Sequence, residues 1–231
     1  MRDHGVEQEV SIEAGNMALD GALGLPKHAR AGAVVLFAHG SGSSRHSPRN
    51  RYVARVLRDA GVGTLLFDLL TAGEESLDQA SGELRFNIPF LAKRLADATR
   101  WLMRRPDTHD ARIGYFGAST GAAAALVAAA ELRGGIGAVV SRRGRPDLAD
   151  HALPRVAAPT LLIVGAEDAP VIGMNRRALV DLGSAVKRIS VVPRATHLFE
   201  EPGTLEEVAR LAAGWFKRYL ASAEKAAALA T

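Results

Sequence analysis

Three side chains that could cleave an ester together occur in a fixed order along the chain: Ser119, Asp168 and His197. A serine hydroxyl becomes a nucleophile when a histidine takes its proton, and a carboxylate then holds that imidazole in the required tautomer. The order serine, acid, histidine differs from the orders found in chymotrypsin-type and subtilisin-type enzymes. We therefore predict a catalytic triad in which Ser119 attacks, His197 transfers protons and Asp168 orients the histidine.

The nucleophile lies in a G-x-S-x-G pattern, Gly117-Ala118-Ser119-Thr120-Gly121. Residues 112–116 before it predict a buried strand, and residues 122–132 after it predict a helix free of glycine and proline. A sharp turn between a strand and a helix holds such a serine with its hydroxyl exposed, and the glycines avoid collisions with neighbouring backbone. The alternative is that Ser119 serves only as the helix N-cap, a position that serine favours.

The acid and the base each follow a strand-like run. Asp168 comes shortly after the aliphatic residues 160–164, and His197 follows residues 189–192. In open α/β sheets, functional residues gather just beyond the carboxyl ends of the strands, so both are expected at one sheet edge. Asp168 could instead cap the next helix, and His197 could be a surface histidine.

Two further acids compete for the role of Asp168. Asp147 and Asp150 follow a run of arginines and are expected to lie in a solvated loop. We therefore place the triad acid at Asp168 rather than at either of them.

A glycine-rich loop follows the strand predicted over residues 33–38: His39-Gly40-Ser41-Gly42-Ser43-Ser44. An H-G-x-G loop in this position supplies one backbone amide of an oxyanion hole, and the residue after the nucleophile supplies the other. We expect these amides at Ser41 and Thr120, and we expect His39 to support the loop structurally.

Candidate substrate-binding residues are fewer. His46 could line the mouth of the pocket, and Arg142 and Arg143, together with Arg145, could select an anionic substrate. The alternative for the arginines is a solvated loop, because scattered charges usually face water.

Strand-like and helix-like segments alternate along the chain, which predicts an α/β fold with a mostly parallel, twisted sheet and helices on both faces. Strands are expected at residues 6–13, 18–25 (a hairpin), 33–38, 64–67, 112–116, 136–140, 160–164 and 187–192. Helices are expected at residues 50–60, 88–105, 122–132, 172–182 and 205–220.

The 231 residues, 48% of them hydrophobic, predict a single domain spanning residues 1–231. Residues 71–83 form a polar, acidic segment without an assigned element, and residues 221–231 an alanine-rich tail expected to be a frayed helix end. The connection between residues 140 and 160 is too short for a large lid domain, which favours small, soluble substrates.

Composition narrows the class of protein. The net charge of +4 is spread along the chain rather than concentrated in a basic block, which argues against nucleic-acid binding. The absence of cysteine excludes disulfides, thiolate metal sites and a cysteine nucleophile. No spacing of acids and histidines suggests a metal site, and no cofactor is expected. Without a signal-like or membrane-spanning apolar stretch, we expect a cytoplasmic monomer or homodimer that binds no membrane.

The chain resembles the α/β-hydrolase superfamily and, within it, the small dienelactone hydrolase-like branch. Residues 140–147, 168–172 and 195–203 are similar to segments of bacterial hydrolases of that branch, and the likeness extends over residues 34–220. Some members are fused to a phosphoribosyltransferase-like domain, which we do not expect in this chain. Dienelactone hydrolases carry cysteine at the elbow where this chain has Ser119.

The resemblance, with serine as the nucleophile, implies an esterase that cleaves small carboxylic esters through an acyl-enzyme. Two alternatives remain open. A thioesterase or acyltransferase would use the same triad and differ only in the leaving group or the acceptor. A non-catalytic α/β-hydrolase scaffold would act as a binding protein, but such proteins usually lose a member of the triad.

Overall fold

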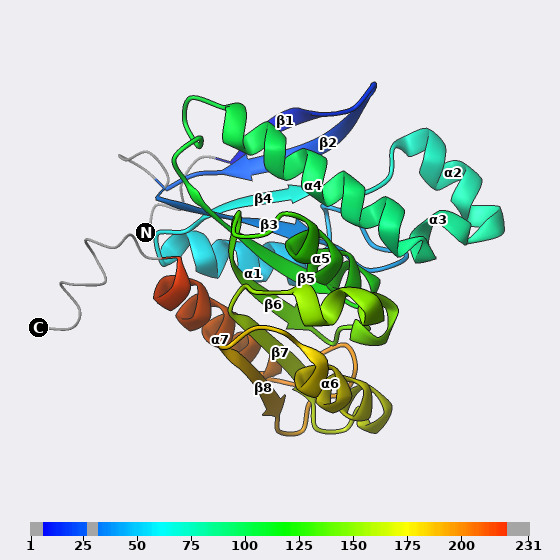
Figure 1. Cartoon of the computed structure of the whole chain (residues 1–231), viewed down its shortest axis with the longest axis vertical. Helices are drawn as coiled ribbons and strands as arrows, with labels where there is room; N and C mark the ends of the chain where they lie inside the picture. Colours follow the sequence, from blue (N-terminus) through cyan, green and yellow to red (C-terminus); the bar gives the residue numbers. More distant parts are fainter. Residues whose placement is uncertain (1–6, 27–31, 221–231) are drawn as a thin grey trace, which may run out of the picture.

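The computed structural model describes residues 7–26 and 32–220, and it confirms the predicted α/β architecture. Eight strands form one sheet in the order β1-β2-β4-β3-β5-β6-β7-β8, shown in Figure 1. The strands are β1 (Glu7–Ala14), β2 (Met17–Gly24), β3 (Ala33–Ala38), β4 (Gly63–Phe67), β5 (Arg112–Ala118), β6 (Ile136–Arg142), β7 (Thr160–Gly165) and β8 (Lys187–Val192).

The six strands from β3 to β8 run parallel, while the hairpin β1–β2 pairs antiparallel at one edge. Parallel strands share one carboxyl edge, so the loops that follow β3, β5, β7 and β8 leave the sheet on the same side. The loop after β3 is the predicted oxyanion loop. The predicted nucleophile follows β5, the acid follows β7 and the histidine follows β8. Residue 6, included in the first predicted strand, lies outside the described residues.

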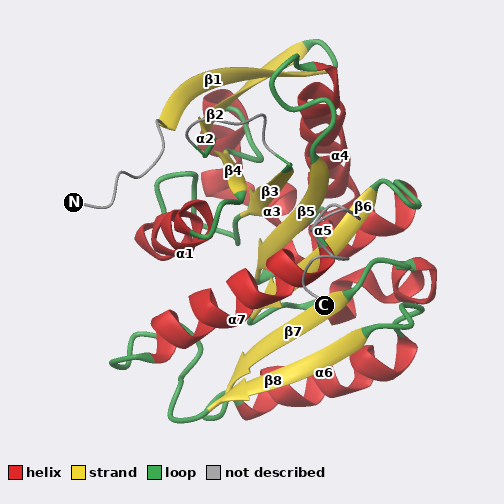
Figure 2. Ribbon diagram, turned by 90° about the vertical axis from the view of Figure 1, so that its left-hand side faces the viewer, coloured by secondary structure: helices red, strands yellow, loops and turns green. Residues whose placement is uncertain are grey.

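Helices cover both faces of the sheet (Figure 2). The helices α1 (Pro48–Asp59) and α7 (Thr204–Tyr219) pack on one face, around an apolar cluster that includes Phe37 and Phe116. The helices α4 (Ile88–Arg104), α5 (Thr120–Glu131) and α6 (Ala169–Asp181) lie on the other face. Buried parallel strands need this double cover because both of their faces are apolar.

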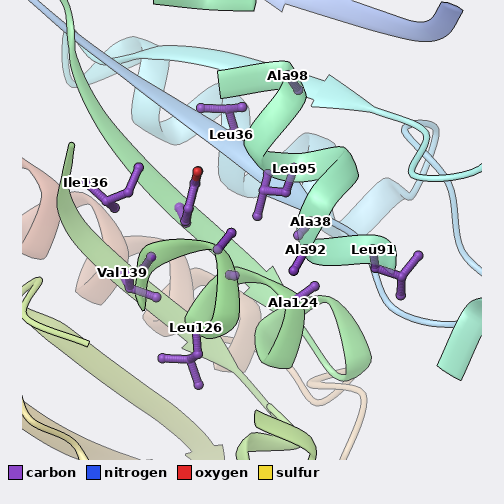
Figure 3. Close-up of a cluster of buried hydrophobic side chains, with 14 of the residues drawn as sticks. Leu36, Ala38, Leu91, Ala92, Leu95, Ala98, Ala124, Leu126, Ile136 and Val139 are labelled. Atoms are coloured by element: carbon purple, nitrogen blue, oxygen red, sulfur yellow. The ribbon is translucent and has the colours of Figure 1, made fainter. Parts of the chain in front are cut away.

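The second face owes its close packing to the alanines of α5. Ten of the twelve residues of this helix are buried. Figure 3 shows Ala124 and Leu126 of α5 in one buried cluster with Val139 of β6 and Leu95 of α4. Small side chains let the helix that carries the nucleophile lie directly against the sheet, and the dense packing fixes its position.

Two segments differ from the sequence expectation. Residues 71–83, predicted without an element, contain the whole of helix α2 (Ala72–Ser81) and the first residue of the short helix α3 (Glu83–Phe86). The segment after β6, expected as a solvated loop, forms the 3₁₀ helix η1 (Pro146–Arg155), which packs against α5 and α6. Its buried residues Ala149, Ala152 and Leu153 explain the difference, because they cover part of the core.

Candidate active site

The turn between β5 and α5 has the geometry of a nucleophile elbow. Ser119 adopts φ 52° and ψ −120°, a positive φ that is unfavourable for any residue with a side chain. Its side chain makes no capping hydrogen bond to α5, so the N-cap interpretation is not supported. Strain of this kind persists only where the surroundings enforce it, and it gathers at functional sites.

Both glycines of the motif are required by close contacts. A Cβ atom at Gly117 would lie 2.8 Å from the backbone nitrogen of Ala122, and one at Gly121 would overlap the carbonyl oxygens of Ala38 and His39. The elbow therefore packs backbone against backbone on its own helix and on the end of β3. The glycine-rich loop after β3 is held beside the nucleophile as a result.

Asp168 and His197 meet at the carboxyl edge of the sheet. The Nδ1 atom of His197 lies 2.5 Å from Oδ2 of Asp168, and the aspartate side chain is only 11% exposed. Because a carboxylate accepts, this contact requires a proton on Nδ1, and in the neutral ring Nε2 is then an acceptor. Among the described residues, Ser119 and His197 form no hydrogen bond with each other. Catalytic hydrogen bonds are often long in unliganded enzymes and tighten when substrate binds.

The loop that carries His197 is fixed by the end of β7. A Cβ atom at Gly165 would lie 2.7 Å from the carbonyl oxygen of Thr196, so only glycine allows this approach. The Glu201 carboxylate also accepts hydrogen bonds from the backbone N–H and the hydroxyl of Thr196. The hydrogen bond from the Thr196 hydroxyl lowers the pKa of Glu201. These contacts hold the histidine loop in place beside Asp168.

His39 supports the glycine-rich loop, as expected. Its Nε2 atom accepts from the backbone N–H of Leu69 at 3.1 Å, so Nδ1 carries the proton and donates to the carbonyl oxygen of Gly40 at 3.0 Å. Burial lowers the pKa of His39, which favours this neutral form. With both ring nitrogens engaged, His39 has no atom left to act as a base.

The two predicted oxyanion residues lie in contact. The backbone N–H of Ser41 donates to Oγ1 of Thr120 at 3.0 Å. Thr120 is the first residue of α5 and is 2% exposed. A Cβ atom at Gly40 would lie 3.0 Å from Cβ of Ser119, so this loop and the elbow touch at a second point.

A cavity of about 250 Å³ opens beside these two residues. One wall is the glycine-rich loop with Thr120, and the floor includes Leu69 and Leu91. The other wall, which sequence reasoning missed, comes from α2 and α3 and carries Glu75, Asp78, Gln79 and Arg85. Asp78 is 1% exposed, and its hydrogen bond from Arg85 lowers its pKa.

Arg142 does not lie in a solvated loop. Its side chain is 1% exposed, lies over the ring of Phe116 and donates to Oδ1 of Asn50 at 3.1 Å. Its Nε and Nη1 atoms have no partner among the described residues. Burial, with further contributions from Arg143 and Arg49, lowers the pKa of Arg142 to about 9. The solvated-loop interpretation is therefore wrong for this residue.

The other predicted substrate-binding residues lie at different depths. Arg143 is half-buried with φ 44°, and its N–H donates to the carbonyl oxygen of Ile163 at 2.8 Å. Burial lowers its pKa, and the charge of Asp168 acts against that shift. His46 is exposed and lines neighbouring hollows rather than the cavity beside the elbow. The rival acid Asp147 is paired with Arg145.

Nowhere in residues 7–26 and 32–220 do three or more acids and histidines gather as a metal site requires. Within the same ranges, none of the helices combines the length and apolarity needed to cross a bilayer.

Comparison with known proteins agrees with this architecture. Residues 19–228 match the model of the dienelactone hydrolase family. Two sequences from Mycobacterium tuberculosis strains, provisionally named phosphoribosyl transferases, are 56% identical over 214 residues, which is 93% of this chain. The chain spans about half, 47%, of the length of these curated relatives.

Solved structures show the same similarity. A dienelactone hydrolase from Anabaena variabilis superimposes with a TM-score of 0.91 at 57% identity, covering 95% of this chain and 100% of that one. Est1E from Butyrivibrio proteoclasticus superimposes with a TM-score of 0.78 over 93% of this chain and 99% of its own. At 14% identity, this second similarity concerns the fold alone.

Proposed function

Since the chain belongs to the dienelactone hydrolase family and is a hydrolase by that membership, we propose that it cleaves small carboxylic esters with Ser119, His197 and Asp168. The observation that carries the proposal is the hydrogen bond between His197 Nδ1 and Asp168, 2.5 Å long, at the sheet edge where the strained Ser119 turn also lies. A protonated Nδ1 leaves Nε2 free to accept the serine proton.

In the proposed acylation, Ser119 Oγ forms a bond to the ester carbonyl carbon while His197 Nε2 takes the hydroxyl proton. Asp168 stabilises the imidazolium without becoming protonated. The carbonyl oxygen becomes an oxyanion next to the backbone N–H of Thr120 and the loop around Ser41. When this intermediate collapses, the bond to the alcohol oxygen breaks, and the alcohol leaves with the proton from His197.

Deacylation repeats the same steps with water. His197 takes a proton from water, the resulting hydroxide oxygen bonds to the acyl carbon, and the carboxylic acid leaves as the bond to Ser119 Oγ breaks. The proton returns to Ser119, so the cycle needs no metal or cofactor. Removal of one oxyanion donor typically costs ~3 kcal/mol, so the loop near Ser41 is part of the machinery.

The size of the cavity supports small substrates. About 250 Å³ accommodates a short acyl chain, and the polar side chains Glu75, Gln79 and Arg85 on one wall suit a soluble rather than a fatty substrate.

We also propose that Arg142 and Arg143 favour an ester that carries an anionic group. Arg142 has no carboxylate partner among the described residues, and Arg143 beside it lowers its pKa further. Arg49 also contributes to that shift, although it is itself paired with Glu200 at 3.1 Å. A buried charge without a counter-ion attracts an anion strongly because little water screens it. His46, on the rim of adjacent hollows, would contact only substrates longer than the cavity.

A series of p-nitrophenyl esters with purified protein tests the proposal. We expect a rapid release of p-nitrophenol equal to the amount of enzyme, followed by steady turnover, since an acyl-enzyme forms first. Comparison of a neutral ester with one of equal length that ends in a carboxylate tests the arginines. In Arg143→Met the preference for the charged ester should decline, while Arg145→Met, whose arginine is paired with Asp147, should keep it.

A thioesterase or an acyltransferase with the same triad is the second candidate. The same acyl-enzyme would form, but thioesters would be better substrates, or an alcohol would replace water as acceptor. Matched thioesters and added alcohols separate these cases. The name phosphoribosyl transferase belongs to relatives about twice as long as this chain. The chain covers 47% of the length of those relatives.

A further inference from the structure

The side-chain hydroxyl of Thr120 makes a hydrogen bond to the glycine-rich loop, in addition to the backbone N–H that this residue offers to the oxyanion. Its Oγ1 atom accepts the backbone N–H of Ser41 at 3.0 Å, across 79 residues of sequence. Thr120 is 2% exposed, and it lines the cavity together with Ser41 and Gly40. The hydroxyl therefore lies where the glycine-rich loop meets the start of α5, one residue after Ser119 and at the edge of the cavity.

This hydroxyl keeps one proton without an acceptor. A threonine hydroxyl accepts through its lone pairs and donates one proton. One lone pair accepts the Ser41 N–H, and among the described residues the Thr120 side chain donates to no protein group. Buried donors in proteins almost always have a partner. Because Thr120 lines the cavity, we infer that this proton is available to a group bound there.

The same contact bears on the role expected of Ser41, whose backbone N–H is predicted to bind the oxyanion directly. Its N–H is already engaged by Oγ1 of Thr120 in the free protein, so an oxyanion could reach this amide only by displacing the hydroxyl. Hydrogen bonds in a chain strengthen one another, and an N–H donated to a hydroxyl oxygen makes the hydroxyl proton a better donor. The Ser41 amide can thus act through Thr120 without moving.

We propose that the Thr120 hydroxyl is a catalytic oxyanion donor, with the Ser41 amide as its positioning partner. The oxyanion would then receive two hydrogen bonds from one residue, the backbone N–H and the side-chain O–H of Thr120. The inference rests on the proposed serine hydrolase function. It goes beyond that function because it assigns catalysis to a side chain rather than to the amide of the loop.

A transition-state analogue separates this role from simple packing. Ser119 Oγ adds to the carbonyl carbon of a trifluoromethyl ketone, His197 Nε2 takes the hydroxyl proton, and the carbonyl oxygen becomes an oxyanion. The matching methyl ketone serves as a ground-state ligand of similar shape. Both are measured as inhibitors with wild type, Thr120→Val, Thr120→Ala and Thr120→Ser. The control is Thr160→Val, the same change at another buried threonine. Thr160 is the first residue of β7, at the end of the strand away from the active-site edge, and its hydroxyl donates to the carbonyl oxygen of Ala158.

We expect Thr120→Val and Thr120→Ala to weaken inhibition by the trifluoromethyl ketone about 100-fold, with a similar loss in kcat, as removal of one oxyanion donor does elsewhere. Inhibition by the methyl ketone and KM should stay near wild type. Thr120→Ser should retain both properties within a few-fold, because it keeps the hydroxyl. If the valine variant does not fold, the alanine variant provides the same comparison.

Four results would overturn the inference. Inhibition of Thr120→Val as strong as that of wild type would mean that the hydroxyl only occupies the Ser41 amide. Equal losses of trifluoromethyl ketone inhibition in Thr120→Val and Thr160→Val would mean that the substitution acts on the structure. Equal losses of inhibition by the trifluoromethyl and methyl ketones in Thr120→Val would mean the same. A wild-type protein that neither hydrolyses esters nor gains the ketone mass at Ser119 would contradict the proposed function itself, and the mass measurement identifies that case.

Discussion

Asp168 occupies the N-cap of α6, but its carboxylate bonds to Nδ1 of His197 at 2.5 Å and makes no hydrogen bond to the helix. An aspartate at this position ordinarily stabilises its helix by accepting a backbone N–H. Here that stabilisation is absent, and the side chain is used to orient an imidazole. The relationship explains why the two residues should act as one unit.

We expect His197→Ala to reduce kcat almost as much as loss of the nucleophile, and the double variant with Ser119→Ala to be little worse than either alone. Groups that act together in one step give non-additive losses. Asp168→Asn should reduce kcat on the order of 10³- to 10⁴-fold, because the imidazole would adopt the wrong tautomer. Steady-state kinetics on variants with wild-type circular dichroism measure these effects. His39→Ala provides the contrast, since turnover lost there but retained in His197→Ala would place the base on the glycine-rich loop.

Chain length of the acyl group should control activity. The cavity of about 250 Å³ is bounded by α2 and α3, so acetyl to butyryl esters should have the highest kcat/KM, and values should fall steadily for longer chains. The check is kcat/KM for p-nitrophenyl esters from two to twelve carbons. A maximum at ten carbons or more would show that the α2–α3 wall does not limit the site.

Gly121→Ala should destabilise the fold as well as abolish activity. The added methyl group would overlap the carbonyl oxygens of Ala38 and His39, and overpacking of this kind costs about 1–3 kcal/mol or more. Gly214→Ala is the matched control, because a Cβ atom at this glycine of α7 meets nothing within 4 Å. That variant should be stabilised by roughly 0.5–1 kcal/mol. Urea unfolding of both variants measures the difference, and equal stabilities would contradict the tight contact at the elbow.

Stability should depend on pH through His39. Burial lowers its pKa in the folded protein below the ordinary value of 6.5, so the unfolded chain binds a proton more readily. The stability contributed by neutral His39 is complete above the unfolded pKa and is lost as the pH falls from about 6.5 toward the lower folded value.

The free energy of unfolding, measured from pH 7 down to pH 5, should therefore decrease more in wild type than in His39→Gln. His151→Gln, at an exposed histidine, should follow wild type. Parallel curves for wild type and His39→Gln would contradict a buried neutral His39.

The sheet and the elbow could be predicted because their signals are local. Apolar runs mark the strands, and the glycines at 117 and 121 mark the turn. The helix α2 also had a local signal that was not used, the capping box formed by Thr71 and Glu74. With that signal, a helical wall beside the site could have been expected.

Other features have no local signal. The burial of Arg142 depends on Phe116 and Asn50, which lie 26 and 92 positions earlier in the chain. The hydrogen bond between Ser41 and Thr120 joins the loop after β3 to the first residue of α5, two segments that the sheet brings together. Such contacts follow from tertiary packing, so single-sequence patterns do not contain them.

The most direct test of the proposed function is the identity of the acylated residue. Protein mixed with p-nitrophenyl butyrate, quenched in acid within the first turnover and digested, should carry the butyryl mass on the peptide that contains Ser119. Ser119→Ala should lack the adduct and lose turnover on the order of 10⁶-fold, while Ser11→Ala, at an exposed serine, should behave as wild type. A folded Ser119→Ala protein with near-wild-type turnover, or an adduct on another residue, would contradict the account.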